Sequence, residues 1–140
     1  MEKVPFRSGL KKYQDWDWVL RAAALEGVSF EILSEPLAIC RIDEEERKTV
    51  GSQDMWKYSF DWLRQNRNLM TRRAYAGFVA TQLAPQASRQ GAWKAFLPLL
   101  WEMHRFGAPK TIDLLLFMGM WFAPRGFRRK SRALFKKTSL

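Results

Sequence analysis

The sequence predicts a mainly α-helical, bundle-like domain with a small two-stranded β element near residues 28–42. Three observations support this fold class. The chain has 140 residues and is 47% hydrophobic, which is enough to bury one modest core. After Gly51 the pattern is that of nearly continuous helix, interrupted by proline and glycine. Only residues 28–42 carry the short apolar, β-branched runs that are typical of strands.

The first expected helix covers about residues 12–26 and stops at Gly27. Apolar residues at helical spacing predict its buried stripe, which consists of Tyr13, Trp16, Leu20 and Ala23, with Val19 beside them. The opposite face is expected to be exposed and carries Asp15, Trp18 and Ala22. Two short strands, VSFEIL at 28–33 and LAICRI at 37–42, are expected to follow, with a turn between them.

Three longer helical stretches are expected after the acidic loop at 43–48. The first has Ser52 as its N-cap, runs toward Leu83 with a break near residues 66–68, and ends at Pro85. The second covers about residues 92–106, with a kink at Pro98 and His104 as a polar residue of its last turn.

The last expected helix, about residues 111–122, is apolar nearly all round. The apolar run is shorter than the roughly 20 residues needed to cross a bilayer. A basic tail, residues 127–137, follows it.

Charge is unevenly distributed along the chain, whose net charge is +10. Residues 1–60 contain nine Lys or Arg and eleven Asp or Glu, whereas residues 61–140 contain fifteen and three. The second part therefore produces a positive field that suits anionic lipid, nucleic acid or nucleotide phosphates. Charge alone does not choose among these partners.

The single cysteine, Cys40, excludes an internal disulfide and fits a reducing compartment. The opening residues, MEKVPFRSG, lack the apolar core of a secretory leader. We therefore expect a cytoplasmic protein, located at the inner face of the membrane if its basic part binds lipid.

The segment Asp15-Trp16-Asp17 admits three interpretations. A metal site is disfavoured, because residues 15 and 17 of a helix point about 200° apart. In a catalytic site, Asp15 takes a proton from an acceptor hydroxyl while a nearby indole stacks on a sugar ring. In the third interpretation both aspartates only stabilise the helix N-terminus, by ~0.3–1 kcal/mol. The pattern alone favours the third.

An ordered series of short motifs covers about residues 6–52. It comprises Gly9-Leu10, Gln14-Asp15-Trp16-Asp17-Trp18, Leu20-Arg21, Gly27, Glu35-Pro36-Leu37-Ala38 and Ile39-Cys40-Arg41. The series resembles the C-terminal part of family 2 glycosyltransferases with the GT-A fold. The helical remainder resembles the variable C-terminal extension of those enzymes.

The resemblance implies two regions. Residues 1–51 would be the acceptor-side remnant of the catalytic domain, and residues 52–140 a helical, basic extension. It further implies inverting transfer of a sugar from a nucleotide sugar to a glycan or lipid-linked acceptor, with Asp15 as the general base. The implied substrate-binding residues are Trp16, Asp17, Trp18 and Arg41.

Two departures from the family pattern limit what the resemblance implies. Gln14 stands where the family usually has Glu, and no histidine follows Arg41 as a metal ligand. We therefore assign no metal to this chain and place any divalent metal, Mg²⁺ or Mn²⁺, in a full-length parent. The sequence shows nothing like a donor-binding half, so we expect the isolated chain to be inactive.

The alternative function is a basic helical interaction module. It would bind an anionic membrane surface through the basic tail and the apolar helix before it. In the competing structural interpretation, that helix is simply core and the tail is solvated. Nucleic-acid binding is disfavoured, because the tryptophans fall at helix-burying spacings. We also expect a homo-oligomer, with contacts at residues 16–20 or 114–122.

Overall fold

The computed structural model describes residues 4–31, Glu35 and residues 55–122. These residues are mainly helical, which confirms the predicted fold class, and they contain no strand. Residues 28–31 are described and are not part of a strand, while most of the predicted β element lies outside the described residues. Cys40, Arg41, Ser52 and the basic tail at 127–137 lie outside them too.

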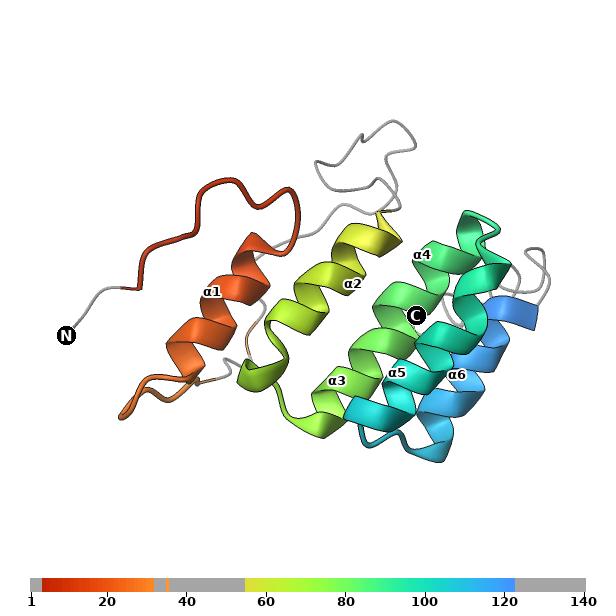
Figure 1. Ribbon diagram of the computed structural model, residues 1–140. Helices are drawn as coiled ribbons and strands as arrows, with labels where there is room; N and C mark the ends of the chain where they lie inside the picture. The colour runs from red at the N-terminus through yellow and green to blue at the C-terminus, as the bar shows by residue number, and fades with distance from the viewer. Residues whose placement is uncertain (1–3, 32–34, 36–54, 123–140) are drawn as a thin grey trace.

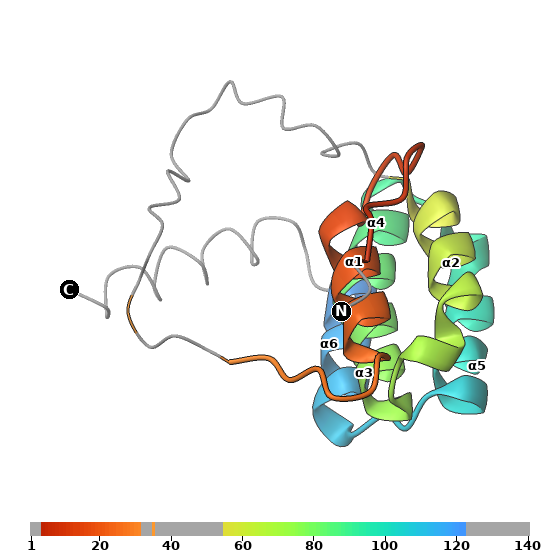
Figure 2. The ribbon, with the colours of Figure 1, turned by 90° about the vertical axis from the view of Figure 1, so that its left-hand side faces the viewer.

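A continuous helical rod forms the centre of the fold (Figure 1). It consists of α3 (Arg72–Phe78), a π-helical turn (Val79–Leu83) and α4 (Ala84–Arg89). Four helices surround the rod: α1 (Gln14–Ala23), α2 (Trp56–Gln65), α5 (Phe96–Phe106) and α6 (Thr111–Phe122). Figure 2 shows α1 and α6 along one side of the rod, and α2 and α5 along the other. In both views α1, α2 and α5 begin at the same end of the bundle.

The rod supplies most of the core, because both of its faces are covered. Its buried side chains include Tyr75, Phe78, Val79, Leu83 and Ala87. The outer helices add Trp62, Leu63, Leu99, Met103, Phe117 and Trp121. Burial of a large apolar side chain contributes about 1.5–3 kcal/mol, so this cluster is the main source of stability.

Tyr13 connects the first segment of the chain to this core. The ring of Tyr13 lies 4.7 Å from Trp62 and 5.3 Å from Phe78, measured between centroids. The hydroxyl of Tyr13 donates to Ser59 Oγ at 2.9 Å and accepts from Gln86 Nε2 at 3.1 Å. The position of α1 beside α2 is therefore fixed by buried polar and aromatic contacts.

The prediction that Pro85 ends a helix is wrong, since α4 continues through it to Arg89. Proline cannot donate the backbone hydrogen bond that an α-helix interior requires. Here the preceding turn, Val79–Leu83, has π-helical hydrogen bonds, so the hydrogen-bond register changes just before Pro85. Pro85 therefore lies in the first turn of α4, where proline is tolerated. Pro98 likewise lies in the first turn of α5, where no donor is needed. The expected break near residues 66–68 is confirmed.

The last helix, α6, has the predicted bounds, and a buried carboxylate fixes it to the rod. Asp113 is buried and accepts hydrogen bonds from Arg73 Nη1 and from the backbone N–H of Lys110, the latter at 2.7 Å. Burial alone would raise the pKa of Asp113, but the hydrogen bonds and positive charges of Arg73 and Lys110 outweigh it and lower this pKa below the ordinary 3.8.

Asp113→Asn is expected to destabilise the fold by about 2 kcal/mol at neutral pH. This is less than the ~3–5 kcal/mol of a fully buried pair, because the Arg73 side chain is 43% exposed. A lowered folded pKa gives stability that is present above the unfolded pKa and lost as the pH falls through the folded value. The difference in urea-unfolding free energy between the wild type and the variant should therefore shrink below about pH 4. A difference that is the same at pH 7 and pH 3 would contradict this assignment.

None of the helices in the described residues combines the length and the hydropathy required to span a membrane.

Candidate functional site

The loop before α1, residues 4–10, folds back across one face of that helix. Trp18 Nε1 donates to the carbonyl of Val4 at 2.9 Å, and Arg21 Nη2 donates to that of Pro5 at 2.7 Å. The ring of Phe6 stacks on Trp18 with centroids 5.7 Å apart. This loop therefore covers the helix face that bears Trp18.

Asp17 is the centre of this arrangement. It is fully buried, and each of its carboxylate oxygens is bound by an arginine. Arg7 Nη1 donates to Oδ1 at 3.1 Å, and Arg21 Nε donates to Oδ2 at 2.8 Å. Asp17 is consequently engaged in a structural ion pair with two partners and presents no free oxygen to a metal ion or a substrate.

The predicted faces of the first helix are partly wrong. Trp16 is 47% exposed and Val19 and Ala23 are exposed, whereas Trp18 is half-buried and Ala22 is buried. A helical wheel predicts burial correctly only where one face of the helix is covered. In the structure the loop at 4–10 covers the opposite face as well, and this shifts burial toward Asp17 and Ala22.

Asp15 lies in the first turn of α1 and is exposed, as predicted. Within the described part of the chain it has no hydrogen bond and no ion pair. The neighbouring indole of Trp16 is held by the edge of Phe78, 5.5 Å away, and by Tyr13, 6.0 Å away. Asp15 and Trp16 are thus an accessible carboxylate and an accessible, well-seated aromatic ring, and as consecutive residues of α1 they point about 100° apart. Arg41 lies outside the described residues.

No three potential ligands among His, Cys, Asp and Glu side chains come together in the described residues. With the Asp17 carboxylate bound by two arginines, Asp15-Trp16-Asp17 does not fit a divalent metal ion.

A hollow of about 500 Å³ opens between the loop, α1 and the segment after it. It is lined by apolar side chains that include Val4, Trp18, Leu25, Val28 and Phe30. Several large apolar side chains of the same region are exposed: Phe6, Trp16, Val19, Leu25, Val28 and Phe30.

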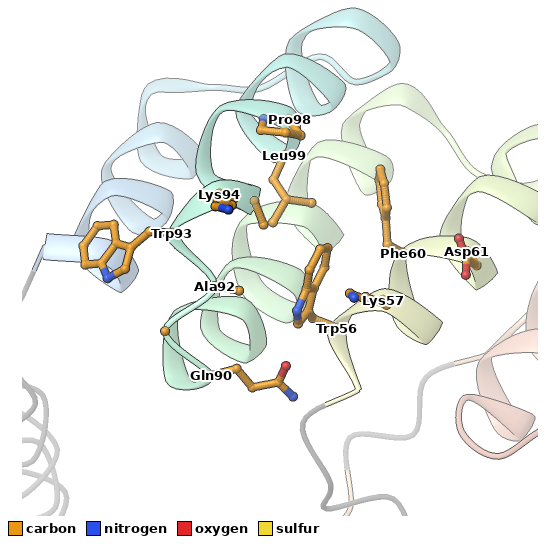
Figure 3. A pocket seen from close by; sticks show the side chains of 12 residues that line it. Trp56, Lys57, Phe60, Asp61, Gln90, Ala92, Trp93, Lys94, Pro98 and Leu99 are labelled. Carbon is orange, nitrogen blue, oxygen red and sulfur yellow. The ribbon is translucent and has the colours of Figure 1, made fainter.

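A larger groove of about 870 Å³ lies between α2 and the start of α5 (Figure 3). The rings of Trp56 and Phe60 project from α2 toward the side where Pro98 and Leu99 lie. Its polar lining groups are Lys57, Asp61, Gln90 and Lys94. Because α1, α2 and α5 begin at one end of the bundle, this groove lies at the same end as Asp15. Its size and aromatic walls suit a small organic ligand.

Sequence reasoning did not find this groove. A signal was present in Trp56 and Phe60, which are four residues apart and therefore share a face of α2. Nothing in the sequence, however, places the turn at 90–95 opposite that face.

The outer faces of α5 and α6 carry a third apolar surface, which we call the α5–α6 face. It consists of Trp93, Leu97, Trp101, Ile112, Leu115, Met118 and Phe122, all exposed. Ring contacts join α6 to α5 and to the 3₁₀ turn before it: the ring of Phe122 lies 5.6 Å from Phe96 of α5 and 5.9 Å from Trp93 of the turn. The exposed basic residues Lys94, Arg105 and Lys110 lie near its ends.

Comparisons of the chain with protein-family models, with curated proteins and with solved structures give no match.

Proposed function

We propose that this chain is the acceptor-side part of an inverting, nucleotide-sugar-dependent glycosyltransferase. The observation that supports the proposal is that the two aspartates have different environments. Asp17 is buried and bound by Arg7 and Arg21, which fixes the start of α1. Asp15 is left exposed and free of described partners beside the accessible ring of Trp16. The motif series at residues 6–52 implies the same role for Asp15, but it also implies substrate binding by Asp17, which this proposal replaces with a structural role.

In the proposed reaction Asp15 accepts the proton of an acceptor hydroxyl as that oxygen attacks the anomeric carbon of the sugar. The bond from the anomeric carbon to the diphosphate breaks, and the nucleoside diphosphate leaves with the bonding electrons. Attack from the opposite side inverts the configuration. Trp16 offers an aromatic surface on which the acceptor sugar can stack.

The exposed apolar side chains around α1 support the same proposal. Val28 and Phe30 line the 500 Å³ hollow and are exposed, as are Phe6, which stacks on Trp18, and Val19 of α1. We propose that a donor-binding half of the enzyme covers this surface. The active site would then lie between the two parts, with Asp15 contributed by this chain.

The test measures nucleoside diphosphate release from a panel of nucleotide sugars. The 140-residue chain alone is compared with the same chain supplied with a donor-binding half encoded upstream in its reading frame. We expect no transfer from the chain alone and transfer from the combination. Transfer by the isolated chain would contradict the proposed division of the active site, and no transfer by the combination would contradict the transferase function itself.

The α5–α6 face favours a second function, attachment to an anionic membrane surface. Its tryptophans and aliphatic side chains suit the bilayer interface, and the nearby basic residues suit anionic headgroups. Such attachment would bring a lipid-linked acceptor to the enzyme.

Co-sedimentation with vesicles tests this attachment. We expect binding to vesicles that contain anionic lipid, weaker binding to neutral vesicles, and at least tenfold loss in the variants Leu97→Glu and Leu115→Glu, which place a charge on exposed apolar positions. Val19→Glu is the matched control, because Val19 is exposed away from this face. Equal loss of vesicle binding in all three variants would mean that the α5–α6 face does not bind the membrane specifically. If light scattering shows a dimer that Leu97→Glu and Leu115→Glu dissociate and Val19→Glu does not, the face is a dimer interface instead.

A further inference from the structure

A small polar pocket lies at the end of the bundle opposite to Asp15. It has a volume of about 350 Å³. Three arginines from three different elements converge on it: Arg67 from the 3₁₀ turn after α2, Arg72 from the start of α3 and Arg105 from the last turn of α5. Its other lining residues are Asn68, Met70, Tyr75 and Phe106. None of the described residues that line it is acidic.

Contacts with the protein hold these guanidinium groups in position. Arg67 lies over the ring of Phe106 at 4.5 Å, and Arg105 lies 5.4 Å from the same ring centroid. Arg72 donates from Nη2 to the carbonyl of Gly107 at 3.1 Å. A guanidinium has five N–H donors, so these contacts leave most donors of the three groups available. Side chains that are already oriented lose less entropy when a ligand binds.

The nearest buried acid is occupied by other groups. Glu102 accepts a hydrogen bond from the hydroxyl of Tyr75 at 2.7 Å and forms an ion pair with Arg64 at 3.7 Å. Burial, together with the hydrogen bond to Glu102, raises the pKa of Tyr75, so its hydroxyl stays protonated and keeps Glu102 engaged. Glu102 is therefore engaged by Tyr75 and Arg64, and no ion pair of Glu102 with Arg67, Arg72 or Arg105 is found among the described residues.

We propose that this pocket binds the phosphate group of a phosphomonoester or diphosphate. Three convergent guanidiniums match the charge and the several acceptor oxygens of phosphate, which a single carboxylate does not provide. The ring of Trp101, 59% exposed, lies 5.8 Å from Phe106 at the edge of the pocket. A phosphate carried by a lipid would therefore have an apolar surface beside its headgroup, while a free phosphate would use the arginines alone.

The experiment follows the arginine side-chain Nε–H signals of the 140-residue chain by NMR. One titration uses sodium pyrophosphate, and a second uses a short-chain phosphatidic acid below its micellar concentration. We expect the signals of Arg67, Arg72 and Arg105 to shift together with one dissociation constant. Arg67→Gln and Arg105→Gln should each weaken binding by at least about tenfold, as expected when a charge-assisted contact is lost. Arg67→Lys should retain part of the affinity, because lysine keeps the positive charge. It should not retain all of it, because lysine lacks the planar pair of N–H donors of a guanidinium.

Lys11→Gln is the control, because it also removes one exposed positive charge but lies just before α1, at the opposite end of the bundle. Equal binding of both phosphates would identify a free phosphate ligand. Tighter binding of the lipid, with a shift of Trp101 emission that Trp101→Phe removes, would identify a headgroup. The proposal is overturned if neither phosphate moves the three signals, or if the arginine variants bind no more weakly than Lys11→Gln. Neither result bears on sugar transfer, because Asp15 is at the opposite end of the bundle.

Discussion

Asp15→Asn is expected to lower kcat of the assembled transferase by about 10²–10⁴-fold, the usual contribution of a general base. The amide is nearly isosteric with the carboxylate but cannot accept the proton of the acceptor hydroxyl. Because Asp15 is exposed and has no hydrogen bond in the described part of the chain, the substitution should leave the fold intact. The measurement is steady-state kinetics with the donor-binding half present. We expect an unchanged KM for the nucleotide sugar.

Two controls make this result specific to proton transfer. Glu31→Gln removes another exposed carboxylate from the same segment and should change kcat by less than about twofold. Asp15→Glu keeps a base but displaces it by one methylene, so part of the activity should remain. If Asp15→Asn keeps full activity, the aspartate only stabilises the helix N-terminus, and the general base must be sought elsewhere.

The sequence predicted the helical elements well, because they are encoded by local signals. Apolar periodicity and the proline and glycine stops gave α5 and α6 nearly to their ends. Pro85 was misinterpreted because a change in hydrogen-bond register, which has no clear sequence signature, allows a proline inside the rod.

The candidate site was predicted only in part, because its geometry depends on contacts between distant residues. The exposure of Asp15 followed from its position at a helix start. The burial of Asp17 depends on Arg7, ten residues earlier, and on a loop that folds back over the helix. The arginine pocket shows the same limit: Arg67, Arg72 and Arg105 meet only because α5 packs against α3. Charge counts predicted a positive second half of the chain, but they did not predict that three of its arginines meet at one pocket.

Asp17→Ala is expected to cost about 3 kcal/mol in the stability of the first segment, at the lower end of the range for a broken buried ion pair. The substitution leaves Arg21, whose side chain is 17% exposed, without its carboxylate, and it frees Arg7 and the loop at 4–10. The lower end applies because the Arg7 side chain is 54% exposed and can be solvated. Hydrogen exchange should report faster exchange of amides in residues 14–23, with little change in the rod.

Comparison of the two aspartate variants separates structure from chemistry. Asp15→Asn should lower transfer and change the unfolding free energy by less than about 1 kcal/mol, the limit of its interaction with the helix dipole. Asp17→Ala should destabilise the segment, and it should lower transfer only to the extent that α1 is displaced. Activity of Asp17→Ala should therefore recover with a stabilising osmolyte, whereas that of Asp15→Asn should not. A transfer defect in Asp17→Ala that persists in a fully folded protein would mean that Asp17 contacts the substrate after all, and the assignment of the general base would have to be reconsidered.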